Sequence, residues 1–282
     1  MKKLLIFCDS IKISHSVFAL PFAVAAAFLA AEGLPEGPIL GKIVLAVVLA
    51  RTSAMAFNRL LDADIDAANP RTQNRAIPAG LLSRTFVAAA ALVCAALFVA
   101  VAAWINRLAF ILSPVALAVL LGYSYTKRFT ALSHVVLGTA LGLSPLGAWV
   151  AVTGEVALLP ALLGAAVLFW TAGFDVIYSC MDREFDTRYG LHSIPRHLGV
   201  ARALLLTRLF HLTAVLLLIA VGVLAELGTA YIVGIVCVIL LLAYENSLVR
   251  PNDLSRVNVA FFTMNGMVSL VFMAAVIVQT VL

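Results

Sequence analysis

Residues 156–186 read VALLPALLGAAVLFWTAGFDVIYSCMDREFD, a long apolar stretch that ends in a group of acidic side chains. About 20 consecutive apolar residues are enough for a helix to cross the hydrocarbon core of a bilayer. The stretch therefore predicts a membrane-spanning helix over 156–177 with carboxylates at its end.

The composition of the whole chain is typical of a membrane protein. Of its 282 residues, 63% are hydrophobic and 12% are charged, whereas soluble domains average about 45–50% and about 25%. This composition excludes a soluble enzyme and a disordered chain. The net charge of +5 is spread between apolar blocks and does not form one basic stripe. We therefore expect the lipid bilayer as a partner and no nucleic acid.

Nine stretches are long and apolar enough to predict membrane-spanning helices. We expect an all-α integral membrane protein that forms a single polytopic domain over residues 1–282. The predicted spans are 16–31, 39–57, 85–104, 108–125, 131–151, 156–177, 203–224, 228–245 and 257–281.

The distribution of basic residues predicts the orientation of these spans. Cytoplasmic loops of membrane proteins carry an excess of lysine and arginine. With the N-terminus inside, 17 of the 19 lysines and arginines fall on the inner side, and only Lys42 and Arg107 fall outside. We therefore expect a cytoplasmic N-terminus, a C-terminus on the opposite side, and function at the inner face.

Two acidic stretches, 120 residues apart, resemble each other. The first reads NRLLDADID over 58–66, and the second reads DVIYSCMDREFD over 175–186. Each contains D-x-x-x-D four residues after a polar side chain, and residues i and i+4 lie on one face of a helix. The pattern predicts one stripe of Asn58, Asp62 and Asp66 and another of Asp175, Tyr178, Asp182 and Asp186.

The same stretches predict an internal repeat. Each follows an outward-to-inward span, and each runs into a basic loop with an Ile-Pro pair. We expect parallel pseudo-repeats over about 16–125 and 131–245, followed by a ninth helix over about 257–281. The two bundles would surround a central cavity that opens to the cytoplasmic side, and the two carboxylate stripes would face each other across it.

Facing carboxylates need counter-charge, because they repel one another and lose hydration at the end of a membrane span. Mg²⁺ binds carboxylate oxygens and leaves positions for phosphate oxygens, and nearby arginines and lysines can clamp a phosphate. A single D-x-x-x-D is more often a solvated helix face, but the second copy beside a basic loop favours a metal–diphosphate site with one metal per stripe.

The motifs around these stretches resemble those of the UbiA superfamily of intramembrane prenyltransferases. The first family motif, N-[D/R]-x-x-D-x-x-x-D, is similar to residues 58–66, and the second, D-x-x-Y-[S/A]-x-x-D-x-x-x-D, to residues 175–186. An R-T-x-N-R-x-I-P-x-G element is similar to residues 71–80, and a Y-x-x-x-K-R-x-T element to residues 123–130. The resemblance covers essentially the whole chain.

The resemblance implies an enzyme of the inner membrane that uses Mg²⁺ and a polyprenyl diphosphate donor. It would prenylate a ring carbon of an aromatic acid in quinone biosynthesis. The chain is most similar to the 4-hydroxybenzoate polyprenyltransferases. Its opening segment 12–21 and the arginine form of the first motif also resemble a branch that prenylates a dihydroxynaphthoate in an alternative menaquinone route. Both acceptors stay open.

The expected site residues fall into two groups. The expected metal ligands are Asp62, Asp66, Asp182 and Asp186, with Asn58 beside the first ion. We expect cationic side chains to neutralise the departing diphosphate, because electrostatic stabilisation usually dominates such reactions. These are Arg75, Lys127 and Arg128.

Four further residues have more than one interpretation. Arg51 lies inside a predicted span, on the same face as Asn58, and either pairs with the acceptor's carboxylate or neutralises the acidic cluster. Asp175 either shapes the acceptor pocket or accepts the ring proton, or it holds Tyr178 or an arginine in place. Tyr178 and Tyr123 either contact a phosphate oxygen or the carbocation, or are ordinary interfacial tyrosines.

Other classes of membrane protein also use embedded carboxylates. A transporter would place them near the bilayer midplane on broken helices, whereas here they end spans beside basic loops. A CDP-alcohol phosphotransferase would carry D-x-x-D-G-x-x-A-R, which the sequence lacks. A superfamily member with another acceptor, such as haem, a chlorophyll-type ring or a glycerol phosphate, stays open as an alternative.

Overall fold

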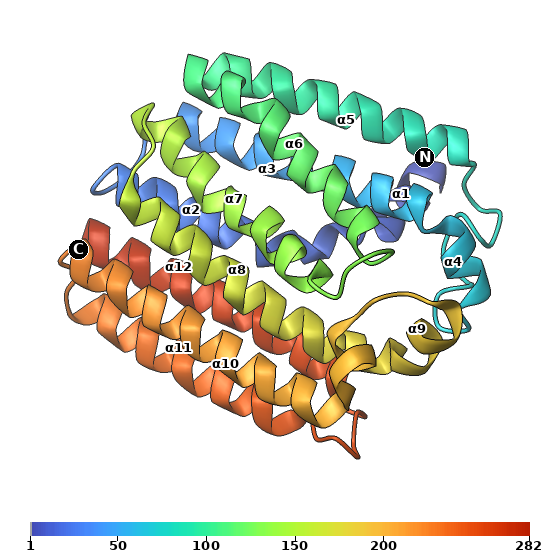
Figure 1. Cartoon of the computed structure of the whole chain (residues 1–282). Helices are drawn as coiled ribbons and strands as arrows, with labels where there is room; N and C mark the ends of the chain where they lie inside the picture. Colours follow the sequence, from blue (N-terminus) through green and yellow to red (C-terminus); the bar gives the residue numbers. More distant parts are fainter. Residues whose placement is uncertain (1) are drawn as a thin grey trace.

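The computed structural model describes residues 2–282, except the side chains of residues 2 and 13–15, and shows a bundle of long helices (Figure 1). In chain order the elements are α1 (Lys2–Ser10), η1 (Ile13–Phe18), α2 (Leu20–Ala30), α3 (Gly37–Leu61), α4 (Ala63–Ala68), α5 (Arg84–Ile105), α6 (Arg107–Thr126), α7 (Ser133–Thr153), α8 (Leu158–Ser179), η2 (Cys180–Asp182), α9 (Arg183–Tyr189), α10 (Ile194–Leu224), α11 (Thr229–Leu248), η3 (Val259–Met264) and α12 (Asn265–Val281).

The predicted fold class is confirmed, but the predicted number of full-length spans, nine, is wrong. Within the described residues, 8 helical segments are long and apolar enough to cross a membrane. The predicted first span, 16–31, is instead a shorter apolar helix over Ser16–Ala30. It is short because the chain enters it through the 3₁₀ turn η1 and leaves it where Glu32 adopts a φ of 49°.

The other predicted spans agree with observed helices to within a few residues, with one exception. α10 begins at Ile194, well before the predicted span 203–224, and is interrupted at Gly199, which has φ 75° and ψ 162°. Such a φ is readily adopted only by glycine. The segment between the predicted spans 156–177 and 203–224 therefore contains η2, α9 and the beginning of α10.

Helix α8 lies at the centre of the bundle, packed between α7 and α10. Glycines bring the backbones of α7 and α8 into direct contact. A Cβ atom on Gly138 would lie 2.3 Å from the carbonyl oxygen of Leu168, and one on Gly142 would lie 2.4 Å from that of Gly164. Small residues at helix interfaces are the usual means of tight packing in a bilayer, and here they fix the position of α8.

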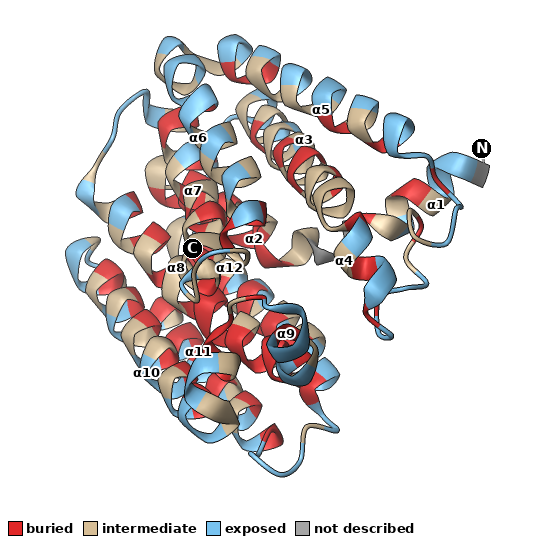
Figure 2. Cartoon of the chain, turned by 45° about the vertical axis from the view of Figure 1, so that its right-hand side comes forward, coloured by how far each residue is buried: buried red, intermediate tan, exposed pale blue. Residues whose placement is uncertain are grey.

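The apolar outer surface has the character of a lipid-facing surface. Figure 2 shows buried residues in the middle of the bundle and exposed ones along the outer faces of α5 and α10. Leu92 of α5 is 71% exposed and Val223 of α10 is 74% exposed. Large apolar faces of this kind are stable in lipid and not in water. The chain is therefore a multi-pass membrane protein.

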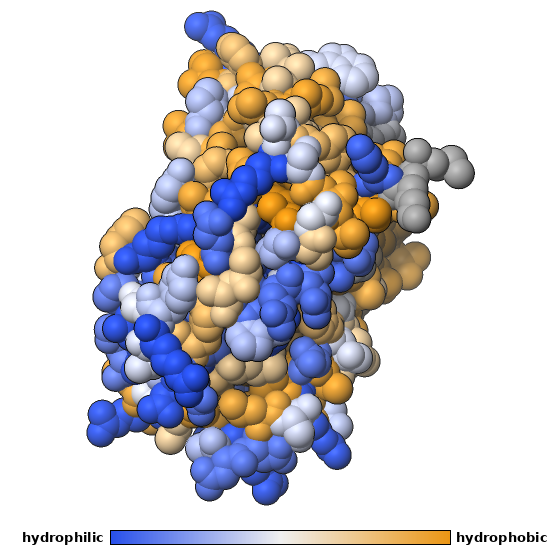
Figure 3. All heavy atoms as spheres, turned by 90° about the vertical axis from the view of Figure 1, so that its right-hand side faces the viewer, coloured by the Kyte–Doolittle hydropathy of each residue, from blue (hydrophilic) through white to orange (hydrophobic). Residues whose placement is uncertain are grey.

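One end of the bundle is polar. Helices α4 and α9 lie there together with the N-terminus, whereas the C-terminus lies at the opposite end (Figure 1). Figure 3 looks onto the polar end and shows many hydrophilic side chains gathered across it. The acidic stretches, which run from α3 into α4 and from α8 into α9, end here.

Candidate active site

Both acidic stretches bend at equivalent positions. Asp62 joins α3 to α4 and has φ −88° and ψ 5°, and Asp182 joins η2 to α9 and has φ −96° and ψ 1°. Each predicted stripe is therefore bent, one at Asp62 and the other at Asp182, and is not one straight helix face. The shared backbone geometry is in keeping with the internal repeat, which stays a prediction.

In the first stretch, each carboxylate of the predicted stripe has a cationic partner. The Arg128 guanidinium lies 3.2 Å from Asp62, and one Arg75 nitrogen donates to both Asp66 oxygens, at 2.6 and 2.8 Å. The Asn58 amide nitrogen donates to Asp62 at 2.9 Å, which leaves the Asn58 carbonyl oxygen as a neutral ligand. Burial raises the pKa of Asp62, and the charge of Arg128 opposes this shift.

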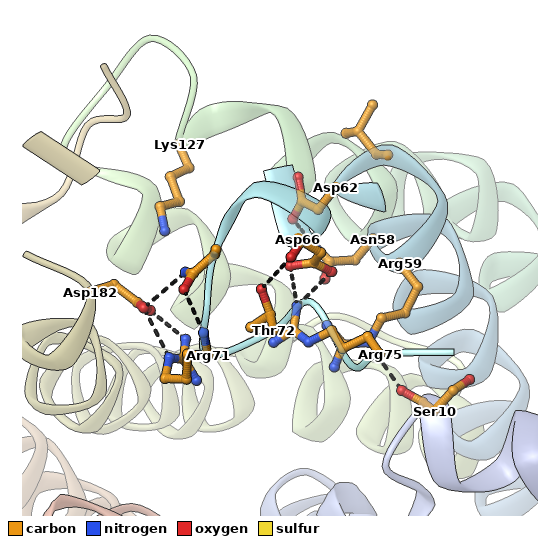
Figure 4. Close-up of polar contacts among 12 residues, drawn as sticks. Ser10, Asn58, Arg59, Asp62, Asp66, Arg71, Thr72, Arg75, Lys127 and Asp182 are labelled. Atoms are coloured by element: carbon orange, nitrogen blue, oxygen red, sulfur yellow. Dashed lines mark hydrogen bonds and ion pairs between the residues drawn. The ribbon is translucent and has the colours of Figure 1, made fainter. Parts of the chain in front are cut away.

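In the second stretch, Asp182 is bound by side chains from the first half of the chain. Arg71 donates to both Asp182 oxygens. Arg71 also donates to the Tyr178 hydroxyl at 2.8 Å, and the Asn69 amide donates to Asp182 at 3.3 Å. Figure 4 shows Asp182 on one side of these contacts and Asp62 and Asp66 on the other. The loop after α4 thus ties the two acidic stretches together.

Asp186 is placed differently from the other carboxylates. It is fully buried and is not among the described residues that line the cavity. Its Oδ1 lies 2.9 Å from the ammonium group of Lys127, which does line the cavity. Asp186 is thus paired with Lys127, and its oxygens accept no well-oriented hydrogen bond from the described residues.

Asp175 lies deeper along α8 and pairs with a histidine. Its Oδ2 lies 2.6 Å from Nδ1 of His134, at the start of α7. Both side chains line the cavity. Tyr123, on α6, is half-buried and lines the same cavity.

Arg51 and Arg59 point from α3 to the end of α1. Arg51 donates to the carbonyl oxygens of Ile11, at 3.4 Å, and Lys12, at 2.8 Å, and Arg59 donates to that of Ser10 at 3.0 Å. Both arginines also line the cavity. They therefore stand between the carbonyl end of α1 and the interior of the bundle.

These residues form the polar end of one cavity of ≈ 680 Å³. Away from the carboxylates, its walls are mostly apolar and come mainly from α3, α5, α6 and α7. Of the predicted site residues, the structure brings all except Asp186 to this cavity. The apolar wall residues include Ile43, Val47, Phe98, Leu112, Leu141 and Ala148.

Four residues that complete the polar end were not among the predicted site residues. Arg71 and Arg59 lie inside the motifs, and their positions in or beside the acidic stretches could have indicated that they belong to the site. Asn69 and His134 gave no signal, because their contacts join segments 113 and 41 residues apart. No local pattern in a sequence encodes such contacts.

The donor set at the polar end fits a hard divalent cation. Within the described residues, no three His, Cys, Asp or Glu side chains are gathered into a metal site. Mg²⁺ typically binds one or two carboxylates and takes its other ligands from water and substrate phosphates. Asp62, Asp66 and Asp182, with the Asn58 carbonyl, line the polar end and are donors of this kind, whereas Asp186 lies behind Lys127.

The fold and the cavity together define a membrane-embedded enzyme whose cavity has a charged end and an apolar body. Comparison with known protein families agrees with this class of protein. The sequence model of a family described as "UbiA prenyltransferase family" matches residues 19–267. The chain belongs to the UbiA prenyltransferase family, and it is a prenyltransferase.

Named relatives and solved structures are similar over most of the chain. A 4-hydroxybenzoate solanesyltransferase from Synechocystis sp. is 36% identical over 67% of this chain and 68% of its own length. A 4-hydroxybenzoate octaprenyltransferase from Nitrosomonas europaea is 31% identical over 90% and 86%. The apo structure of a UbiA homolog from Aeropyrum pernix K1 is 36% identical, with a TM-score of 0.86 over 94% of this chain and 98% of that one.

A more distant structure shows the same fold. It is a UbiA homolog from Archaeoglobus fulgidus bound to DMAPP and Mg²⁺, 20% identical, with a TM-score of 0.74 over 97% of this chain and 98% of that one.

Proposed function

We propose that the protein transfers a polyprenyl group from a polyprenyl diphosphate to a ring carbon of an aromatic acid, in a reaction that depends on Mg²⁺ and serves quinone biosynthesis. The observation that carries this proposal is the cavity itself. Carboxylates and cations from both halves of the chain gather at one end, and apolar side chains line the rest. A diphosphate and a prenyl chain have the same division into charged and apolar parts.

The names of the relatives support an aromatic acid as acceptor. One is called a 4-hydroxybenzoate solanesyltransferase and another a 4-hydroxybenzoate octaprenyltransferase. A dihydroxynaphthoate is the second acceptor of the same chemical kind, since it also carries a carboxylate and a ring hydroxyl. The metal is supported by the structures of the Archaeoglobus fulgidus homolog bound to DMAPP or GPP with Mg²⁺.

In this proposal, Asp62, Asp66 and Asn58 hold one Mg²⁺ and Asp182 and Asp186 hold the other. The ions would supply positive charge that stabilises the diphosphate as it leaves. The chain itself supplies further positive charge through Arg71, Arg75, Lys127 and Arg128, which already point at the same carboxylates.

The apolar body of the cavity holds the prenyl chain and keeps water from the allylic cation. The C–O bond of the donor breaks, and the electrons leave with the diphosphate. The ring carbon ortho to the acceptor hydroxyl then bonds to the cation and loses its proton. Arg51 lines the cavity and donates to the carbonyls of Ile11 and Lys12. In this proposal it exchanges them for the carboxylate of the acceptor.

We also propose that the polar end faces the cytoplasm in the inner membrane. This orientation puts 17 of 19 lysines and arginines on the cytoplasmic side. A water-soluble acceptor and the released diphosphate would then enter and leave on that side.

The test is a turnover assay with the purified protein in lipid vesicles. It contains a radiolabelled polyprenyl diphosphate, either Mg²⁺ or EDTA, and a panel of 4-hydroxybenzoate, a dihydroxynaphthoate, haem and a glycerol phosphate. We expect a prenylated aromatic acid with Mg²⁺ and no product with EDTA. Transfer that persists in EDTA, or transfer only to haem or the glycerol phosphate, would contradict the proposal.

A further inference from the structure

One carboxylate in the cavity is partnered differently from the rest. Four aspartates each pair with an arginine or lysine, and these are Asp62, Asp66, Asp182 and Asp186. In the described part of the chain, Asp175 pairs only with His134. A carboxylate that faces a guanidinium or ammonium group is a weaker proton acceptor than one that faces a neutral imidazole. The difference suggests that Asp175 does different work from the other four.

The hydrogen bonds of His134 fix its tautomer. The backbone N–H of Ile194 points at His134 Nε2, at 3.4 Å, and Nδ1 lies 2.6 Å from Asp175 Oδ2. Ile194 is the first residue of α10, where backbone N–H groups have no acceptor within the helix. Because Nε2 faces a donor, it holds a lone pair, and Nδ1 carries the proton that it donates to Asp175.

This geometry leaves one oxygen of Asp175 for the substrate. The His134 side chain is only 5% exposed, whereas that of Asp175 is 23% exposed, and both residues line the cavity. Asp175 Oδ2 is held by the imidazole, and no hydrogen bond from a described residue engages Oδ1. A side chain held at one oxygen by a nearly buried partner has little freedom to rotate.

We propose that His134 is a positioning residue that holds Asp175 as the acceptor of the ring proton. This inference rests on the proposed function. After the prenyl carbon has bonded to the ring, the C–H bond at that ring carbon breaks. Its electrons restore the aromatic ring, and its proton passes to Oδ1 of Asp175, which later releases it to water. His134 does not take the proton, because a second N–H at Nε2 would face the N–H of Ile194.

The test compares His134→Gln with His134→Leu. Glutamine offers a donor for Asp175 and an acceptor for Ile194, whereas leucine offers neither. We expect His134→Leu to lower kcat about 10²-fold, in the range of general-base effects, without changing the KM for the polyprenyl diphosphate. His134→Gln should restore most of this loss.

An isotope effect separates positioning from a general structural role. The acceptor is 4-hydroxybenzoate deuterated at the carbons ortho to its hydroxyl. If proton removal is slowed, it becomes rate-limiting, and a primary deuterium isotope effect on kcat should appear in His134→Leu that is absent from the native enzyme. Asp175→Asn should show the same effect, and it keeps the test available if His134→Leu does not fold.

Other results would overturn the inference. One such result is a lower kcat in both His134→Leu and Asp175→Asn without an isotope effect, and another is an unchanged kcat in both variants. A third is a His134→Gln variant as slow as His134→Leu, which would make the imidazole itself the base. If the native enzyme prenylates no aromatic acid, the proposed function fails and this inference fails with it. If the native enzyme prenylates an aromatic acid and one of these results is found, only the inference fails.

Discussion

At the residue scale, the polar end of the cavity is a set of exchangeable ion pairs. A buried charge without a partner is costly, and Asp66 and Asp182 are only 5% and 7% exposed. Arg75 and Arg71 balance their charges. When a metal–diphosphate binds, we expect the arginines to move to phosphate oxygens and the carboxylates to bind metal, so that no charge is left unpaired.

Two aspartates on the short helix α4 provide a matched test of this view. Asp66 is buried and lines the cavity, whereas Asp64 is exposed and pairs with Arg84 on the surface. We expect Asp66→Asn to lower kcat by about 10²–10³-fold, the range seen when one stabilising group is lost from an active site. Asp64→Asn should leave kcat unchanged, because exposed ion pairs contribute little.

The measurement is prenyl transfer by both variants at saturating Mg²⁺, with thermal unfolding as a check that each is folded. Equal activity of the two variants would show that the side chain of Asp66 does not take part.

At the element scale, the length of apolar runs predicted most of the helices, but not where two of them begin. An apolar run as long as 85–104 is stable in a bilayer only as a membrane-spanning helix. The segment 16–31 is close to the minimum length, so its 3₁₀ entry and buried position in α2 depend on tertiary packing. The start of α10 was not predicted from the sequence, because charged residues such as Arg196 and Arg202 are typical of a loop between spans.

The candidate site was predictable in part for a similar reason. The i, i+4 spacing of the acidic stretches is local and can be seen in the sequence. Bends at Asp62 and Asp182 and the reach of Arg71 to Asp182 depend on how the loops fold. The pairing of His134 with Asp175 depends on the packing of α7 against α8.

Glycine packing between α7 and α8 leads to a prediction about stability. A Cβ atom on Gly138 would lie 2.3 Å from the Leu168 carbonyl oxygen, whereas one on Gly41 of α3 would meet nothing within 4 Å. We expect Gly138→Ala to destabilise the protein by about 1–3 kcal/mol, the usual cost of overpacking. Gly41→Ala should be neutral or stabilising by up to about 1 kcal/mol, because alanine favours helices.

Thermal unfolding in one detergent measures both variants against the native chain. A Gly138→Ala variant as stable as Gly41→Ala would mean that α7 and α8 do not pack as closely as the structure shows.

At the scale of the whole molecule, the division into a polar end and an apolar body predicts the orientation in the membrane. The N-terminus lies at the polar end and the C-terminus at the other (Figure 1). We expect alkaline phosphatase, which is active only outside the cytoplasm, to be active when fused after Leu282 and inactive when fused within residues 249–256. The reverse result would invert the proposed topology.

The central claim is that carboxylates from both halves of the chain act together on one metal-bound diphosphate. Calorimetric titration of the purified protein with geranyl diphosphate tests it most directly, with Mg²⁺ or with EDTA, in the native chain and in Asp62→Asn and Asp182→Asn. We predict binding that requires Mg²⁺ and is lost in either variant. Binding that persists in EDTA, or that survives the loss of one of the two aspartates, would contradict the account.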